Sequence, residues 1–168
     1  VSLYASTGEV KEPGARIAIL SKNCAWWLMS DLAIWMAGYV SVPLYPTLAH
    51  DTVNQILTHS EAKACFIGKL DGWEGMKPGV PEGMPCISYA LSPDDARKNY
   101  EGWDAICART PPLQGAPVRA ADELATLIYT SGTTGKPKGV MHSFGTFAWA
   151  IGAGIKRIPM GQEDRMLS

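Results

Sequence analysis

The chain has 168 residues, a length that suits one domain of ordinary size. Hydrophobic residues make up 46% of it and charged residues 18%, the latter a little below the roughly 25% of a typical globular domain. The net charge is -1, and the lysines and arginines are scattered along the sequence. Without a basic stripe there is no electrostatic reason to expect nucleic acid as a partner.

The four cysteines lie far apart and form no C-x-x-C pair, so their spacing matches no zinc motif. A chain of this size and apolar content does not need a disulfide framework, and we expect free thiols and a cytoplasmic location. Residues Val1–Gly14 are polar and lack the apolar core of a signal peptide. Because the chain begins with Val1 rather than methionine, we expect residues to be missing in front of it.

The first part of the chain predicts alternating strands and helices. Three short apolar runs are strand candidates: Arg16–Leu20, Val40–Leu44 and Ala64–Ile67. Between them, Asn23 is a candidate cap for a helix that ends at Gly38, and Thr47 begins a second, amphipathic helix. This β-α-β-α-β order predicts an α/β fold, a layered sheet of parallel strands with flanking helices and right-handed crossovers.

The first of these helices is apolar on nearly every face, with Asp31 as the main exception. It is too short to span a membrane, so we expect it to be buried in protein. Its tryptophans, Trp26, Trp27 and Trp35, are interpreted as core residues rather than as the wall of a binding pocket.

Residues 72–93 are rich in glycine and proline and predict an irregular connection around one short strand at Cys86–Ala90. The remaining predicted elements, in chain order, are a helix over Asn99–Arg109, a loop over Thr110–Pro117, a strand over Asp122–Tyr129, an extended segment at Gly139–Met141, a helix capped by Ser143, and the start of a strand at Asp164–Ser168.

The stretch Leu127–Val140 carries the clearest chemical signal. It places four serine or threonine hydroxyls, three glycines and two lysines in a short loop after an apolar run. Backbone N–H groups beside glycine approach an anion closely, hydroxyls add donors and lysines add charge. This composition predicts a site for a string of phosphates. The alternative is a solvent-exposed hairpin without a ligand, because turns favour the same residues.

Three known phosphate loops do not fit this stretch. The Walker A pattern needs a hydroxyl residue and a helix after its lysine, but Pro137 follows Lys136 and favours an extended chain. The dinucleotide fingerprint fails because Arg157 stands where a third glycine is required after Gly152 and Gly154. The kinase glycine loop fails on spacing. What remains is a strand, a hydroxyl-rich turn and an extended return, which can fold over a triphosphate and open to release pyrophosphate.

The run Tyr129–Val140 resembles the signature loop of the adenylate-forming enzymes, a superfamily that includes acyl-CoA synthetases, peptide-synthetase adenylation domains and firefly luciferase. The segments Gly14–Asn23 and Ala37–Thr47 resemble the opening of the large N-terminal domain of this superfamily. The residues of Tyr45–Thr47 and His59–Lys63 are most similar to those of long-chain fatty acyl-CoA synthetases.

The resemblance implies that a carboxylic acid, expected to be a fatty acid, attacks ATP to give an acyl-adenylate, and that coenzyme A then displaces AMP. It also implies Mg²⁺ as a cofactor, with the Thr130 hydroxyl as a candidate ligand. Lys138 is the expected catalytic charge partner of the leaving pyrophosphate, and Lys136 is expected to be more exposed to solvent. The residues expected to hold the β- and γ-phosphates are Thr130, Ser131, Gly132, Thr133, Thr134, Gly135, Lys136 and Lys138.

Four further side chains are candidates for a role at the site or near it. We interpret His142 as fixing the turn before the Ser143 cap rather than as an acid–base group, because no partner carboxylate is evident nearby. Trp149, on the next helix, is kept as a candidate pocket residue. His50 and His59 are expected at the surface around the second helix.

The resemblance runs from Gly14 to the end of the chain and implies a much longer parent enzyme. We therefore expect residues 1–168 to be an incomplete N-terminal AMP-binding domain. Its expected parts are a leader at 1–14, a βαβαβ unit at 15–70, an irregular connection with one strand and one helix at 71–121, and a strand, phosphate loop and helix at 122–168.

Such a fragment is expected to be inactive alone and to self-associate through exposed apolar surface. Peripheral membrane contact by the parent is left open. The alternative is a stand-alone nucleotide-binding or structural module without ligase activity.

Overall fold

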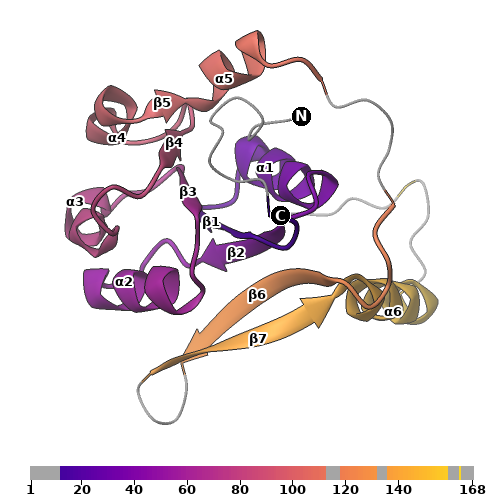
Figure 1. Cartoon of the computed structure of the whole chain (residues 1–168). Coiled ribbons are helices and arrows are strands. Elements are labelled where there is room, and N and C mark those ends of the chain that lie inside the picture. The colour runs from indigo at the N-terminus through magenta and orange to yellow at the C-terminus, as the bar shows by residue number, and fades with distance from the viewer. Residues whose placement is uncertain (1–11, 113–117, 132–135, 159–162, 164–168) are drawn as a thin grey trace.

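A seven-stranded sheet forms the centre of the molecule, in a computed structural model that describes residues 12–112, 118–131, 136–158 and 163. The strand order is β5-β4-β3-β1-β2-β6-β7, as Figure 1 shows. The strands are β1 (Arg16–Leu20), β2 (Val40–Leu44), β3 (Ala64–Ile67), β4 (Cys86–Ser88), β5 (Glu101–Gly102), β6 (Leu124–Ser131) and β7 (Pro137–Ser143). All neighbours are parallel except β6 and β7, which are antiparallel. The predicted α/β fold and its parallel βαβαβ unit are confirmed.

Helices cover both faces of the parallel part of the sheet. They are α1 (Ala25–Met36), α2 (His50–His59), α3 (Trp73–Met76), the 3₁₀ turn η1 (Lys77–Gly79), α4 (Asp94–Asn99) and α5 (Trp103–Arg109), while α6 (Phe144–Arg157) follows β7. Strands buried on both faces read as continuous apolar runs. This is why the bounds predicted for β1, β2 and β3 from the sequence agree with those in the structure.

Successive residues of β1 enter two different cores, because side chains alternate across a strand. Ile17 and Ile19 pack on the side of α1 and α5, whereas Ala18 and Leu20 pack on the side of α2, α3 and α4. Tyr129, at the end of β6, belongs to the second core. The strand that leads into the phosphate-type loop is therefore packed against the α2 side of the sheet.

Helix α1 differs from its prediction in two ways. Its N-cap is Cys24 with no capping hydrogen bond from the side chain, so the assignment of Asn23 as the cap was wrong. The helix buries Ser30, Asp31, Ala33 and Ile34, while Leu28, Met29, Leu32 and Met36 are exposed. A helix that is apolar all round offers no preferred face in its sequence, so the packing decides which face turns inward.

Other helix and strand boundaries also differ from those predicted. Helix α2 begins at His50, and Thr47 lies in the turn before it. The helix expected over Asn99–Arg109 begins only at Trp103, and β4 ends at Ser88 rather than Ala90. The connection after β3 holds the additional elements α3, η1, α4 and β5, so it is more regular than predicted. The proposed domain boundaries themselves stay a prediction.

Tertiary hydrogen bonds stabilise the short elements of this connection. Asp95, in the first turn of α4, accepts a hydrogen bond from Trp73 Nε1 at 2.8 Å and pairs with Lys77 at 2.8 Å. These contacts hold α3, η1 and α4 together, although each has at most six residues. Isolated helices of that length are not stable in water, so the local sequence alone is a weak predictor of them.

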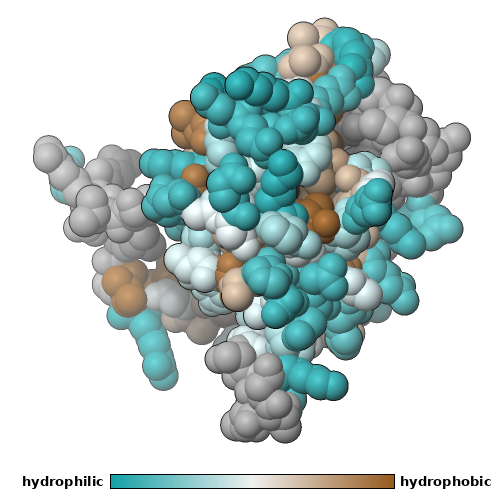
Figure 2. All heavy atoms as spheres, turned by 90° about the vertical axis from the view of Figure 1, so that its left-hand side faces the viewer, coloured by the Kyte–Doolittle hydropathy of each residue, from teal (hydrophilic) through white to brown (hydrophobic). Residues whose placement is uncertain are grey.

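The surface is uneven in its polarity. Figure 2 shows the side that carries α2, α3 and α4, where hydrophilic residues dominate. By contrast α6 has no buried residue among those described, and Trp149, Ile151 and Ile155 are exposed on it. Within the described ranges no helix is both long and apolar enough to cross a membrane. The strand predicted to begin at Asp164 lies outside the described residues.

Candidate phosphate-binding site

The predicted phosphate loop lies at the tip of the β6–β7 hairpin. Register pairs join Ser131 to Pro137, Thr130 to Lys138 and Tyr129 to Gly139. The predicted extended return after Lys136 is thereby confirmed, because β7 begins at Pro137 without an intervening helix. The predicted ligands Gly132, Thr133, Thr134 and Gly135 lie outside the described residues, and Ser131 is described only through its place in β6.

Two of the predicted ligands share one face of the hairpin. Residues directly opposite each other in an antiparallel pair project to the same side, so Thr130 and Lys138 lie side by side next to the turn. Both are exposed, as is Lys136 at the end of the turn. A hydroxyl donor beside an ammonium group can bind a phosphate oxygen without the cost of desolvating a buried charge.

The opposite face of the hairpin is anchored by Tyr129, which is 5% exposed. Its Oη lies 2.7 Å from His59 Nδ1 at the end of α2, and the two rings meet edge to face with their centroids 5.8 Å apart. Burial raises the pKa of the Tyr129 phenol, while Arg16 opposes the shift. The phenol therefore keeps its proton at neutral pH and can donate it to an unprotonated Nδ1.

Gly139 makes room for the tyrosine ring on the neighbouring strand. A Cβ atom at this position would lie 3.1 Å from Tyr129 Cζ and 3.3 Å from its Oη, closer than side chains normally approach. The glycine of the Lys138-Gly139 pair thus has a packing role, in addition to any role in the loop.

The base of the hairpin is joined to the rest of the sheet by a separate set of contacts. Thr126 Oγ1 donates to the Ser41 carbonyl at 3.0 Å, at the one register position where β6 pairs with β2. Trp35 Nε1 donates to the Ala125 carbonyl at 2.8 Å. The predicted packing role of Trp35 is confirmed, and so is that of Trp26 and Trp27, which are half-buried against the same core.

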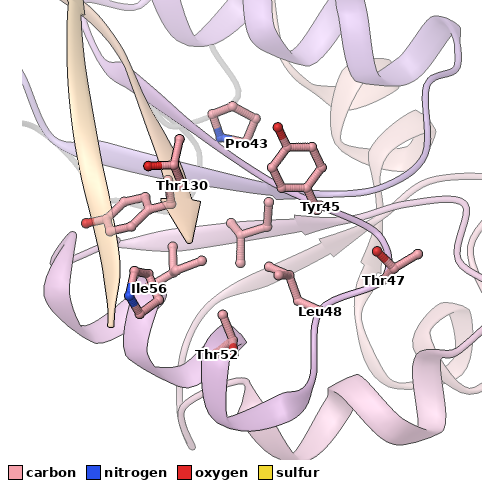
Figure 3. A pocket seen from close by; sticks show the side chains of 10 residues that line it. Pro43, Tyr45, Thr47, Leu48, Thr52, Ile56 and Thr130 are labelled. Carbon is pink, nitrogen blue, oxygen red and sulfur yellow. The ribbon is translucent and has the colours of Figure 1, made fainter. Parts of the chain in front are cut away.

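A pocket of about 350 Å³ opens between the hairpin and the β2–α2 connection. Figure 3 shows Thr130 on one side of this pocket and Thr47, Leu48 and Thr52 on the other. Its wall combines apolar carbons with hydroxyls, and its lining residues are Pro43, Leu44, Tyr45, Thr47, Leu48, Thr52, Ile56, Tyr129, Thr130 and Pro137. The pocket lies at the carboxyl ends of β2 and β6, which is where ligands bind in open α/β sheets.

The profile of a family described as AMP-binding enzyme matches residues 9–168, nearly the whole chain. The chain belongs to the AMP-binding enzyme family. The resemblance to adenylate-forming enzymes seen in Tyr129–Val140 is thus confirmed.

Relatives of this AMP-binding chain include long chain acyl-CoA synthetase 4 of Arabidopsis thaliana, 32% identical over 155 residues, which cover 86% of this chain and 23% of that protein. The chain spans about a quarter of the length of such curated relatives.

Among solved structures, a benzoate CoA ligase from Burkholderia xenovorans LB400 matches with a TM-score of 0.72 at 19% identity, over 89% of this chain and 28% of that one. The O-succinylbenzoate coenzyme A synthetase of Bacillus subtilis, solved in complex with AMP, matches with a TM-score of 0.70 at 22% identity. The match covers 98% of this chain and 38% of that one. These likenesses show that the AMP-binding chain has the fold of the corresponding part of these CoA ligases.

The other sequence candidates of the AMP-binding chain are His142, Trp149, His50 and His59. His142 pairs with Thr126 at the base of the hairpin, and its ring packs against Phe147 at 5.9 Å, which agrees with a structural role. Trp149 is 77% exposed on α6 and is not among the residues that line the pocket. His50 is exposed as predicted; His59 is exposed too, but its contact with Tyr129 was missed.

Candidate ligands of a metal ion among the described residues are carboxylate, imidazole and thiol groups and the Thr130 hydroxyl. Across the described ranges no three histidine, cysteine, aspartate or glutamate side chains are grouped to hold a metal ion. A Mg²⁺ ion bound by nucleotide phosphates keeps several waters and needs few protein ligands. An exposed hydroxyl such as that of Thr130 fits this minor share.

Proposed function

We propose that the whole protein containing this chain is an acyl-CoA synthetase that activates a carboxylic acid, most simply a fatty acid, with ATP and passes the acyl group to coenzyme A. The observation that carries the proposal is the pairing of Thr130 with Lys138 on one exposed face at the tip of the β6–β7 hairpin. Membership of the AMP-binding enzyme family and the long-chain acyl-CoA synthetases among its relatives support the substrate class.

In the first half-reaction, a carboxylate oxygen attacks the α-phosphorus of ATP, and the bond from that phosphorus to the bridging oxygen breaks to release pyrophosphate. Negative charge grows on the leaving β- and γ-phosphates. The ammonium of Lys138 and the hydroxyl of Thr130, together with the hydroxyls and amides of residues 131–135, offset this charge as it develops. Positioning the two anions is the second contribution of the protein, since no covalent nucleophile is needed.

In the second half-reaction, the thiol of coenzyme A attacks the acyl carbon of the adenylate, and AMP leaves. The Thr130 hydroxyl would share in holding Mg²⁺, which would supply positive charge to the phosphates of ATP. A hairpin that is attached to the body at its base and through Tyr129 can open at its tip to let pyrophosphate leave. Cytoplasmic location and peripheral membrane contact stay predictions from the sequence.

The test is ATP–pyrophosphate exchange by the whole protein with a panel of long-chain, short-chain and aromatic carboxylates, followed by measurement of thioester formation with coenzyme A. Exchange with at least one acid, and highest with fatty acids, is expected. Nucleotide binding without exchange for any acid would instead support the binding module without ligase activity.

A further inference from the structure

The two ends of β6 are attached to the body in different ways. At the base, the ladder with β2 and the hydrogen bond from Trp35 hold residues 125 and 126. Beyond Thr126, the described residues of β2 and β6 form no further register pair. At the loop end, the buried ring of Tyr129 and its hydrogen bond with His59 connect the hairpin to the body.

His59 is itself held on a fixed element. It is the last residue of α2, whose buried face packs Val53, Ile56 and Leu57 into the core. Immediately after it, the Ser60 carbonyl accepts a hydrogen bond from Arg16 Nε at 2.8 Å, which ties the end of α2 to the central strand β1. The position of His59 is therefore fixed relative to the centre of the sheet, and Tyr129 contacts a fixed partner.

The residue that contacts His59 is directly bonded to a candidate phosphate ligand. Tyr129 immediately precedes Thr130, and its register partner Gly139 immediately follows Lys138. The ring is fixed from both sides, since Gly139 lies against it on β7 and His59 approaches its hydroxyl from α2. A shift of the ring would move both phosphate-binding candidates together.

We propose that His59 is a positioning residue of the phosphate loop: through Tyr129 it holds Thr130 and Lys138 where the triphosphate of ATP binds. This proposal rests on the proposed function. It assigns a role to a side chain 70 residues before the loop, outside the signature motif.

The first experiment measures ATP binding to the whole protein by calorimetry, without acid or coenzyme A, for His59→Ala and for the matched control His50→Ala. His50 lies on the same helix, is exposed, and contacts Asp51 rather than the hairpin. Loss of one hydrogen bond is expected to weaken ATP binding about threefold to tenfold in His59→Ala. His50→Ala is expected to bind ATP like the wild type.

Kinetic constants and a conservative variant separate positioning from general destabilisation. His59→Ala is expected to raise KM for ATP by the same factor while KM for the acid stays unchanged. His59→Asn keeps a polar atom near the position of Nδ1 and is expected to recover most of the loss. Tyr129→Phe should match His59→Ala, and the double variant should be no worse than either single one, because both remove the same contact.

Amide hydrogen exchange gives a readout that does not depend on activity. In His59→Ala the amides of residues 127–131 should exchange faster, with those of β1 unchanged. Unaltered ATP affinity in His59→Ala, or an equal loss in His50→Ala, overturns the positioning role. If the variants change ATP affinity as expected but the wild type shows no pyrophosphate exchange with any acid, only the ligase proposal is overturned. The two failures can therefore be told apart.

Discussion

The βαβαβ unit and the β6–β7 hairpin differ in how far their strands are buried. Strand β3 is buried along its whole length between helices, and β1 nearly so, whereas β7 is an edge strand with Val140 and Met141 exposed. The unit is specified by burial on two sides. The hairpin instead lies at the edge of the sheet, and its contacts with the body include those of Thr126, Trp35 and Tyr129.

This difference gives a physical reason for the predicted place of the phosphate-binding residues in the hairpin. Groups that contact a nucleotide and then release it must move, and such segments come from the less stable parts of a fold. The buried unit supplies a fixed frame, and the hairpin supplies exposed donors. Substitutions of the exposed hairpin residues should therefore change activity without stability, and substitutions in the unit should do the reverse.

The largest effect is expected for Lys138→Ala. Removing a cation that offsets charge on the leaving pyrophosphate should lower the rate of ATP–pyrophosphate exchange about a hundredfold, or about 2.7 kcal/mol. Because the side chain is exposed, the unfolding midpoint should not change. Lys98→Ala, an exposed lysine on α4, is the control and should leave exchange intact. A similar rate for both variants would remove Lys138 from the mechanism.

Gly68→Ala is expected to act on the buried unit alone. A Cβ atom at Gly68 would lie 2.6 Å from Tyr89 Cδ2 and would also overlap the side chain of Ser21. The Ser21 hydroxyl accepts from the Lys69 amide, so the overlap also disturbs that hydrogen bond. Overpacking of this kind should lower the free energy of unfolding by about 1–3 kcal/mol.

The measurement is denaturant unfolding of the whole protein, with exchange assayed per folded molecule. Gly75→Ala is the control, since its Cβ meets nothing within 4 Å and it lies in α3. A stability unchanged from the wild type in Gly68→Ala would contradict the packing described for this end of β3.

Asp31→Asn should give the smallest change, and in the opposite direction. Burial raises the pKa of the Asp31 carboxyl, while a hydrogen bond with Ser41 opposes the shift. The folded state then binds the proton more tightly than the unfolded state, so stability falls as the pH rises from 3.8 through the raised pKa and stays lower above it.

At neutral pH the neutral asparagine should therefore raise the free energy of unfolding by about 1 kcal/mol. This gain in the free energy of unfolding should vanish when the pH is below the usual aspartate pKa of 3.8. Unfolding curves of the whole protein at acidic and neutral pH measure this, with the exposed Asp122→Asn as the control. A gain that does not depend on pH would show that charge burial is not its cause.

Several elements could have been predicted better from local signals. Helix α4 follows Pro93, carries Asp94 and Asp95 in its first turn and Arg97 and Lys98 in its last, an arrangement typical of a short helix. The Ser143 cap was predicted from the same kind of signal and is confirmed, since its hydroxyl accepts from the Thr146 amide at 3.2 Å. Helix α3 offered little of this kind and is held by Asp95, 22 residues after Trp73.

The sequence by itself determined the three central strands, the parallel order of the βαβαβ unit, the extended return that begins at Pro137 and the family. Continuous apolar runs, proline geometry and a long local motif are properties of neighbouring residues, so they can be seen without a fold. Only the tertiary structure decided that α1 turns Asp31 inward and that His59 meets Tyr129. Both depend on which surfaces the sheet brings together, and residues 70 positions apart carry no local sign of their contact.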